Sequence, residues 1–325
     1  MSRQGMPIDA VISWVDGEDP AHKAKRRQYG KSGELKKDDV AGALRYRSTG
    51  EINYCVASII RFAPWIRRIY IVTDNQNPNL DGFLERNFPD NKIPIEIVDH
   101  KVLFRGYEHY LPTFNSLAIS TMLWRIPGLS DRFIYFNDDV FLTAPAFPDT
   151  WFDGDSTTIY ADYFPAVWAR FLRWCKHLGR KHKLFGHKDP MLNSADILKS
   201  GYFYLFPHAP VPMRRDWYEN FYAEHPDLLH HNIRHRFRDP SQFSAPTLFY
   251  ISARRAGNLR VLPSRGTTVF LSPSMQKADG YMARKIAEAE SLKSFRFGCV
   301  NSLGETTEQE QKVFTDWISS LLDIH

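Results

Sequence analysis

Cysteine is scarce in this sequence of 325 residues, and Cys55, Cys175 and Cys299 lie far apart with no Cys-x-x-Cys pair. This spacing excludes a disulfide framework and a cysteine-rich zinc site, and it favours a reducing compartment. The sequence also lacks any run of about 18 uncharged apolar residues, so we predict no membrane-spanning helix. Residues 1–7 have no apolar signal core, so we expect a cytoplasmic protein.

Three frequent motifs of enzymes are missing as well. There is no G-x-x-x-x-G-K-[ST] loop, no G-x-G-x-x-G fingerprint and no G-x-S-x-G elbow, which argues against a P-loop enzyme, a dinucleotide-binding enzyme and a serine hydrolase. The apolar fraction of 43% suffices for a folded core and excludes disorder as the main state. A net charge of +5 favours anionic partners without naming one.

Four short apolar runs in the first 150 residues each stop at a carboxylate or an amide. The runs are Ile8 to Val15, Arg68 to Thr73, Ile93 to Val98 and Arg132 to Phe136, and they are followed by Asp16 and Asp19, Asp74 and Asn75, Asp99 and His100, and Asn137, Asp138 and Asp139. Helical stretches separate these runs, which predicts an α/β fold with a mostly parallel sheet and covering helices. Because ligands of such sheets bind beyond the carboxyl ends of the strands, the four polar ends predict one site.

The composition changes at about residue 151, where Trp, Tyr, His and Arg become dense. We therefore divide the chain into 1–150 and 151–325, two parts of one integrated unit. The second part contains a basic, aromatic insertion at about 164–200, which predicts a helical or irregular segment that binds either an acidic membrane surface or an anionic polymer, or simply covers the core. A capping box at Thr307 to Glu310 predicts a C-terminal helix.

Asn137, Asp138 and Asp139 directly follow the fourth run. Carboxylate and amide oxygens at a strand end are hard ligands that can hold Mg²⁺ or Mn²⁺ against phosphates. The alternative is a turn in which an aspartate caps the next segment. The polar ends of the other three strands favour the metal site.

The second part of the chain adds groups suited to phosphate chemistry. His208, between two prolines, could accept a proton near neutral pH or simply hydrogen-bond within its loop. In the segment Arg234 to Arg238, an extended backbone would point three guanidinium groups to one face, as phosphate oxygens require; an exposed basic helix or strand is the alternative. His231 and His235 have the spacing of a zinc pair, but no third ligand is evident in the sequence, so we do not predict zinc.

Several blocks of the sequence, taken together, resemble the Stealth family of sugar-phosphate transferases, which includes bacterial capsule polymerases and the catalytic part of lysosomal-enzyme GlcNAc-1-phosphotransferase. The blocks, in the family's order, are Ile8 to Pro20, Glu51 to Tyr54, Ala63 to Ile66, Ile69 to Asp74, Val98 to His100, Leu111 to Ser116, Phe133 to Asp139, His208 to Pro210, Arg234 to Arg238 and Cys299 to Asn301. The resemblance covers most of the chain and departs from the family's pattern at Ala57 and Ser302.

The resemblance implies a Rossmann-like, GT-A-like fold. It also implies transfer of a hexose 1-phosphate from a UDP-sugar to a hydroxyl of a growing, phosphate-linked glycan, with release of UMP. The expected hexose is an N-acetylhexosamine. Residues 1–150 would bind the nucleotide sugar and residues 151–325 the acceptor. The implied catalytic residues are His208 as base with Asp138, Asp139, Asp99 and His100, and Asp138 and Asp139 would also hold Mg²⁺ or Mn²⁺. The implied substrate-binding residues are Asp9, Asp16, Asp19, Arg47, Asn115, Asn137, Arg234, Arg236, Arg238 and Asn301.

Two other functions compete with this one. A GT-A-like glycosyltransferase would move the sugar alone and release UDP, although its usual Asp-x-Asp is absent here because Asn137 and Val140 flank the aspartate pair. A non-catalytic polyanion binder would leave the four acidic strand ends unexplained, since carboxylates repel a polyanion. We therefore expect no nucleic-acid partner, and we expect a protein at the inner face of the cell membrane with capsule-assembly proteins.

Overall fold

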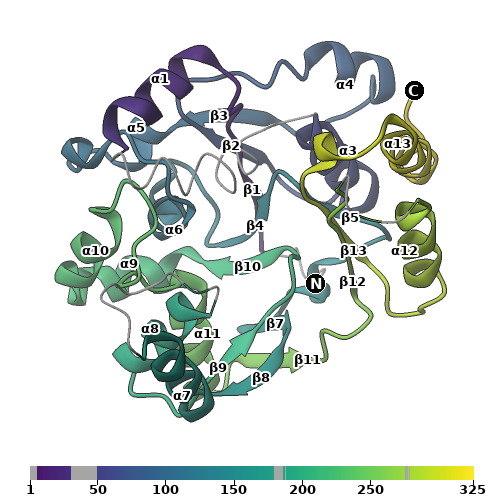
Figure 1. The fold of residues 1–325 in the computed structure, drawn as a ribbon. Coiled ribbons are helices and arrows are strands. Elements are labelled where there is room, and N and C mark those ends of the chain that lie inside the picture. Colours follow the sequence, from purple (N-terminus) through teal and green to yellow (C-terminus); the bar gives the residue numbers. More distant parts are fainter. Residues whose placement is uncertain (1–5, 31–49, 179–185, 187, 275–276, 278) are drawn as a thin grey trace, which may run out of the picture.

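The computed structural model describes residues 6–30, 50–178, 186, 188–274, 277 and 279–325. Arg47 and much of the segment between Leu178 and Lys188 lie outside these residues, so the substrate-binding role predicted for Arg47 has no structural account. A central sheet lies among helices, and smaller sheets flank it (Figure 1).

The central sheet has five strands in the order β10-β4-β1-β2-β3. Four of them run parallel, and β10 pairs with β4 in the antiparallel sense at one edge. The bounds are β1 (Ile8–Ser13), β2 (Ile69–Thr73), β3 (Ile95–Asp99), β4 (Arg132–Asn137) and β10 (Val211–Arg214). The predicted α/β class with a mostly parallel sheet is confirmed.

The strand register brings the polar strand ends to one edge, as predicted. Ser13 pairs with Asn137 on one side and with Val72 on the other, and Thr73 pairs with Asp99. The chain order reverses between β1 and β4, because β2 and β3 continue on the other side of β1. We call the side of the sheet at which the parallel strands end the carboxyl edge. In doubly wound sheets, a switch point of this kind opens a crevice beyond that edge.

Helices follow the strands and cover the sheet on both faces. They include α1 (Pro20–Tyr29), α3 (Glu51–Phe62), α4 (Asp81–Asn87), α5 (His100–Leu103) and α6 (Ser116–Met122), with short 3-10 turns at Glu108–Tyr110 and Leu123–Arg125. α3 buries Ile52, Val56 and Ile59 on one face, at the spacing typical of an amphipathic helix. α6 begins at Ser116, because the side chain of Asn115 accepts a hydrogen bond from the Leu117 N–H and caps the helix.

Three smaller sheets are built from residues 140–142 of the first part together with strands of the second part. Their strands are β5 (Val140–Leu142), β6 (Phe152–Asp153), β7 (Ser156–Tyr160), β8 (Asp162–Pro165), β9 (Tyr202–Leu205), β11 (Leu259–Leu262), β12 (Thr268–Leu271) and β13 (Phe297–Val300). The helices are α7 (Ala166–His177), α8 (Asp189–Ile197), α9 (Arg215–Glu224), α10 (Pro226–Ile233), α11 (Ala245–Arg255), α12 (Tyr281–Glu290) and α13 (Glu308–Leu322), with 3-10 turns at Pro148–Thr150 and Leu303–Glu305. α7 and α8 lie within the predicted basic insertion. No helix in these described ranges is long and apolar enough to cross a membrane.

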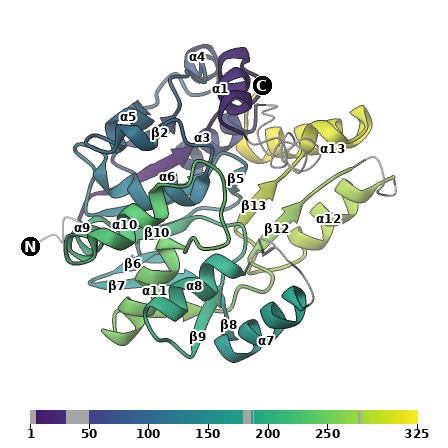
Figure 2. The ribbon, with the colours of Figure 1, turned by 60° about the vertical axis from the view of Figure 1, so that its left-hand side comes forward.

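The hydrophobic cores contain residues of both predicted parts. One cluster joins Val11 and Phe133 to Tyr218 and Leu248, and a second joins Ile12 and Ile134 to Phe297. Both faces of the central sheet are therefore covered in part by the second half of the chain, as Figure 2 also shows from another side. The division at residue 150 stays a prediction.

The C-terminal capping box is only half formed. The Thr307 hydroxyl accepts from the Glu310 N–H and caps α13 as predicted. The buried Glu310 carboxylate instead accepts from the N–H groups of Gly280 and Met282, both at 2.7 Å. It therefore caps α12, because free N–H groups at a helix start attract a carboxylate. This side chain ties the last two helices together.

Candidate active site at the carboxyl edge

Asp138 and Asp139 form the turn between β4 and β5, at the carboxyl edge next to the end of β1. The main chain holds this turn, because the carbonyl oxygen of Asp139 accepts a hydrogen bond from the N–H of Val300 at 2.9 Å. The Oδ2 atom of Asp139 accepts from the thiol of Cys299 at 3.4 Å. The Oδ1 atom of Asp139 is buried and has no hydrogen-bond partner among the residues that the structure describes. A buried carboxylate oxygen with no partner is costly unless a ligand completes it.

α3 and β13 supply neighbours that the sequence analysis did not assign to the site. Glu51, the first residue of α3, is buried and raises the pKa of both aspartates. The thiol of Cys55, one turn further along α3, donates to the carbonyl oxygen of Asn137 at 3.8 Å. Glu51 lies in one of the blocks that carried the resemblance, but its distance from Asp138 is set by tertiary packing.

The pKa values of the aspartate pair are raised, and burial is the main cause for each. Burial and the neighbouring Asp139 and Glu51 carboxylates place the pKa of Asp138 well above its usual range. Burial raises the pKa of Asp139 to about 6, with the Cys299 hydrogen bond acting against it and Glu51 adding to it. Burial and mutual repulsion make ionisation of these carboxylates costly, and a bound cation would lower that cost.

This donor set fits a divalent cation that brings other ligands with it. The two carboxylates, one of which includes the partnerless Oδ1 atom of Asp139, supply hard oxygen donors. Within the described ranges, no three His, Cys, Asp or Glu side chains converge closely enough to hold a metal by themselves. Mg²⁺ commonly binds through one or two carboxylates and completes its shell with water and substrate phosphates. The site therefore suits a metal that binds together with a phosphate-bearing substrate.

The raised pKa of Asp139 predicts how pH acts on stability in EDTA. A group with a folded-state pKa above its unfolded value stabilises the fold at low pH, and that contribution is lost as pH rises through the folded pKa. We expect the Asp139→Asn variant to match the parent in unfolding free energy near pH 4. It should exceed the parent by up to about 3 kcal/mol at pH 7. Urea unfolding across this range measures the difference, and a difference independent of pH contradicts the prediction.

His208 lies in the turn between β9 and β10, on the same edge as the aspartate pair. β10 pairs antiparallel with β4, so the residues before Val211 continue alongside Asn137 and Asp138. The exposed His208 ring stacks on Phe270, with 4.7 Å between centroids. Phe270 pairs with Cys299, which pairs with Val140 in turn. The structure therefore brings the predicted base to the neighbourhood of Asp139.

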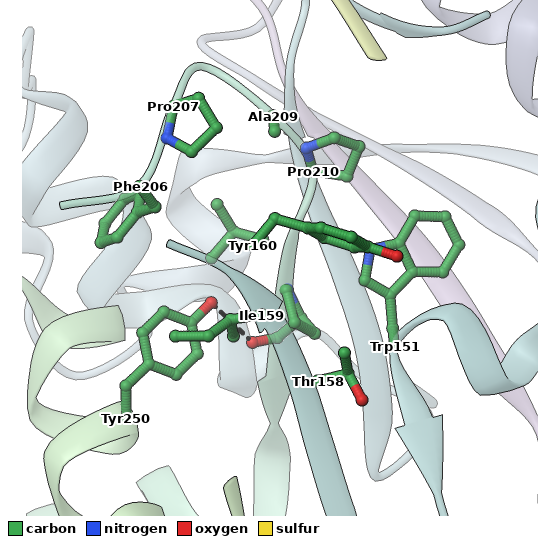
Figure 3. Close-up of a pocket in the computed structure, with 11 residues that line it drawn as sticks. Trp151, Thr158, Ile159, Tyr160, Phe206, Pro207, Ala209, Pro210 and Tyr250 are labelled. Carbon is green, nitrogen blue, oxygen red and sulfur yellow. Dashed lines mark hydrogen bonds between the residues drawn. The ribbon is translucent and has the colours of Figure 1, made fainter. Parts of the chain in front are cut away.

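The turn that carries His208 is packed from below (Figure 3). Trp151, Tyr160 and Tyr250 lie beneath it, and the space left among them and Pro207 to Pro212 is a cavity of only about 10 Å³. The hydroxyl of Tyr250 also donates to the carbonyl oxygen of Pro212 at 3.1 Å. This packing fixes the turn, so His208 projects from a rigid support.

The three arginines of the segment Arg234 to Arg238 do not form the predicted row. The segment follows α10 without forming a strand, and each guanidinium group has its own surroundings. Arg236 donates to the carbonyl oxygens of His109 and Leu111, whereas Arg238 donates to the hydroxyl of Ser116. Arg238 also opposes the rise in the pKa of Tyr135 next to the aspartate pair. Of the three, Arg238 is thus the one placed toward the site.

Asn115 holds this arginine segment. It is fully buried, and its amide nitrogen donates to the carbonyl oxygens of His235 and Phe237 and to the side chain of Gln242. Its Oδ1 atom caps α6. The structure thus gives the side chain of Asn115 partners within the fold, and its substrate-binding role stays a prediction.

Asp9 lies near the start of its strand. It is the second residue of β1, about 13 Å along the strand from Ser13. Its two oxygens accept from Arg67 at 2.8 and 2.6 Å, and Oδ2 also accepts from the N–H of Ser130 at 2.6 Å. The buried Asp9 carboxylate thus pairs with the partly exposed Arg67 near the strand starts, away from the carboxyl edge, and its contact with a nucleotide stays a prediction.

Asp99 and His100 lie on the carboxyl edge but three strand spacings, about 14 Å, from β4. Both oxygens of Asp99 accept backbone N–H groups, from Lys101 at 2.8 Å and from Asn75 at 2.6 Å. His100 is 2% exposed, and burial lowers its pKa to about 4, which leaves it neutral at pH 7. The structure does not bring these two residues next to Asp138, and their catalytic role stays a prediction.

Instead, they border a second polar cluster on this edge. Asp74, after β2, contacts His22 of α1 at 3.4 Å and accepts from Lys25 at 3.0 Å. Burial acts to raise the pKa of Asp74, but these two contacts outweigh it and lower the pKa to about 2. His22 was missed by the sequence analysis because a lone buried histidine in a helix gives no signal.

The remaining predicted residues lie along the carboxyl edge. Asn137 is exposed at the end of β4 and accepts from the Tyr135 hydroxyl at 2.8 Å. Asn301 follows β13, beside the main chain of Asp139. Asp16 and Asp19 follow β1; Asp16 accepts from the N–H of Glu18, and Asp19 caps α1 through the N–H of His22. The structure thus places these four at the predicted edge, and their substrate-binding role stays a prediction.

Comparison with known proteins gives matches over most of this chain. Residues 6–34 match the description "Stealth protein CR1, conserved region 1", and residues 45–160 match "Stealth protein CR2, conserved region 2". Exopolysaccharide phosphotransferase SCO6021 of Streptomyces coelicolor is 41% identical over 49% of this chain, and receptor polysaccharide phosphotransferase WefC of Streptococcus oralis is 27% identical over 97%. The chain spans 27% of the first relative's length and 96% of the second's. The solved galactosyltransferase LgtC aligns over 97% of this chain and 95% of its own, with a TM-score of 0.46 and 10% identity.

Proposed function

Because this chain belongs to the Stealth protein family, we propose that it is an enzyme that transfers a sugar 1-phosphate from a nucleotide sugar to a hydroxyl of a glycan. The observation that carries the proposal is the aspartate pair at the switch point between β1 and β4, with one buried carboxylate oxygen left without a partner. The names of the relatives, which are polysaccharide phosphotransferases, support the same class of reaction.

In the proposed reaction, the acceptor hydroxyl oxygen attacks the phosphorus that carries the sugar. A new P–O bond to the acceptor forms, and the bond from that phosphorus to the bridging oxygen of the diphosphate breaks. The electron pair stays on the nucleoside monophosphate, and the hydroxyl proton moves to a base. Such a reaction needs positioning and charge neutralisation more than covalent work by the protein.

We assign these tasks to residues of the carboxyl edge. His208 accepts the proton, because it projects from a fixed turn beside the aspartate pair and histidine titrates near neutral pH. Arg238 stabilises the phosphoryl oxygens, and Asn137 and Asn301 orient the donor. Asp138 and Asp139 would hold Mg²⁺, which neutralises phosphate charge when bound.

The proposed donor is a UDP-N-acetylhexosamine and the proposed acceptor is a phosphate-linked glycan of a capsular or surface polysaccharide. This choice follows the resemblance of the sequence blocks and gives the positively charged chain an anionic product to hold. Growth of such a polymer also suggests partners that assemble it at the inner face of the membrane.

The identity of the released nucleotide tests the proposal. The purified chain is incubated with Mg²⁺, a panel of UDP-N-acetylhexosamines and short phosphate-linked oligosaccharides, and the nucleotide is identified by chromatography. We expect UMP, together with a phosphodiester signal in the ³¹P spectrum of the product. Release of UDP would instead mean that the sugar alone moves, which contradicts the phosphoryl roles of His208 and Arg238. Omission of the acceptor serves as the control for simple hydrolysis.

A further inference from the structure

α7 presents its apolar side chains to solvent and its small side chains to the protein. Ala166 and Ala169 are buried against α8 and β9, in a cluster with Met191, Leu192 and Phe203. The large apolar side chains of this segment are instead between 50% and 65% exposed: Val167, Trp168, Phe171, Leu172, Trp174 and Leu178. A soluble helix normally shows the reverse order, so this face calls for a partner.

The exposed side chains form one continuous surface, which we call the α7 face. At 100° per residue they span an arc of about 160° around the helix. Phe171 lies between Trp168 and Trp174, with ring centroids 6.1 Å away on each side. The face is convex, and both ribbon views place α7 at the periphery of the molecule (Figures 1 and 2). A convex apolar surface can insert into a deformable partner, such as a lipid layer, more readily than into a rigid groove of fixed shape.

Cations flank the α7 face, and the helix contains no acidic residue. Arg170 lies at one border of the arc and Lys176 at the other, and Arg173 lies on the inward side. Arg170 and Arg173 both pair with Asp196 of α8, at 2.8 and 3.1 Å, which fixes the helix in this orientation. Long basic side chains at the borders of an apolar arc can reach phosphate groups while their stems stay in contact with hydrocarbon.

We propose that the α7 face docks this chain on an anionic lipid bilayer, with α7 parallel to the membrane plane. Two tryptophans and a phenylalanine enter the headgroup boundary, where tryptophan is favoured, and the flanking cations contact lipid phosphates. An acidic polymer as the partner would leave the apolar arc exposed to water, so the observations favour a lipid surface. The proposal does not depend on the reaction proposed above, because α7 contributes no residue to the carboxyl edge where that reaction is placed.

Vesicle sedimentation with the full chain tests the proposal. The vesicles are phosphatidylcholine alone or phosphatidylcholine with one quarter phosphatidylglycerol, each at low and high salt. We expect the parent to sediment with the anionic vesicles and to bind neutral ones several-fold more weakly. The double variant Phe171→Ser/Trp174→Ser should lose binding to anionic vesicles by about tenfold or more, since each exposed ring contributes apolar area.

A matched control removes apolar side chains elsewhere on the surface. The double variant Phe147→Ser/Leu292→Ser changes two exposed positions outside α7 and should bind vesicles as the parent does. Circular dichroism shows whether each variant keeps its fold. Equal binding of the α7 variant and the parent to anionic vesicles would overturn the proposal. Failure of the parent to bind anionic vesicles would overturn it as well. If sedimentation velocity shows a parent dimer that the α7 variant lacks, without vesicle binding, the α7 face joins two copies and the lipid proposal is wrong.

Discussion

The Asp139→Asn variant should lose transferase activity by about 10³-fold while remaining folded. The substitution keeps the shape of the side chain but replaces an anionic oxygen with a neutral amide at the site proposed for Mg²⁺. It also removes the buried carboxylate whose pKa is raised to about 6, so the fold itself should gain stability at neutral pH. The measurements are UMP release under saturating donor and the shift in the unfolding midpoint that Mg²⁺ and the donor produce together, which we expect the variant to lose.

Asp131→Asn is the matched control. Asp131 precedes the same strand at its opposite end, where it pairs with Arg214 at 3.0 Å. Its substitution should leave the rate and the Mg²⁺ response close to those of the parent. Retention of half or more of the parent rate by Asp139→Asn would exclude the aspartate pair as the centre of the reaction.

The His208→Ala variant should lower kcat by about 10²- to 10⁴-fold with little change in donor affinity. The reason is that the ring lies on the surface of a packed turn and contributes its stacking contact with Phe270 but no core packing. If His208 accepts the proton, the acidic limb of the pH–rate profile should disappear in the variant. Donor binding, measured by calorimetry in the absence of acceptor, should stay within about threefold of the parent.

His225→Ala provides the comparison for this histidine. His225 is likewise exposed and contacts a phenylalanine, with its ring tilted by 56° to that of Phe221 and 4.7 Å between the centroids. It lies between α9 and α10, outside the carboxyl edge, and its loss should leave the pH–rate profile unchanged. An equal loss of kcat in both variants would mean that stacking, not proton transfer, explains the effect at His208.

The sheet and its polar edge could be predicted because both depend on short-range pattern. Apolar runs of about six residues predicted the parallel strands, and the residue after each run had to lie at the carboxyl edge. Asp9 belongs to the same sequence block as Asp16, but it lies near the opposite end of β1, because four more residues of the strand follow it. Position within a strand, not membership of a motif, decides which edge a side chain reaches.

Contacts between distant segments were beyond the reach of the sequence. The arginine row assumed an extended backbone, but Asn115 holds that segment in a bent path through two of its carbonyl oxygens. Glu51 and Cys299 approach Asp139 only because α3 and β13 pack against β5. The Glu310 carboxylate likewise accepts hydrogen bonds from two N–H groups at the start of α12 and not from the start of its own helix.

The aspartate turn is also the covalent junction between two sheets. β4 belongs to the central sheet and β5 to the sheet of β12 and β13, and only Asp138 and Asp139 separate them. A shift of one sheet against the other is therefore transmitted to these two residues without any intervening loop to absorb it. Because β13 pairs with β5, a change in the packing of β12 and β13 would move the two carboxylates, although both strands lie more than 120 residues further along the chain.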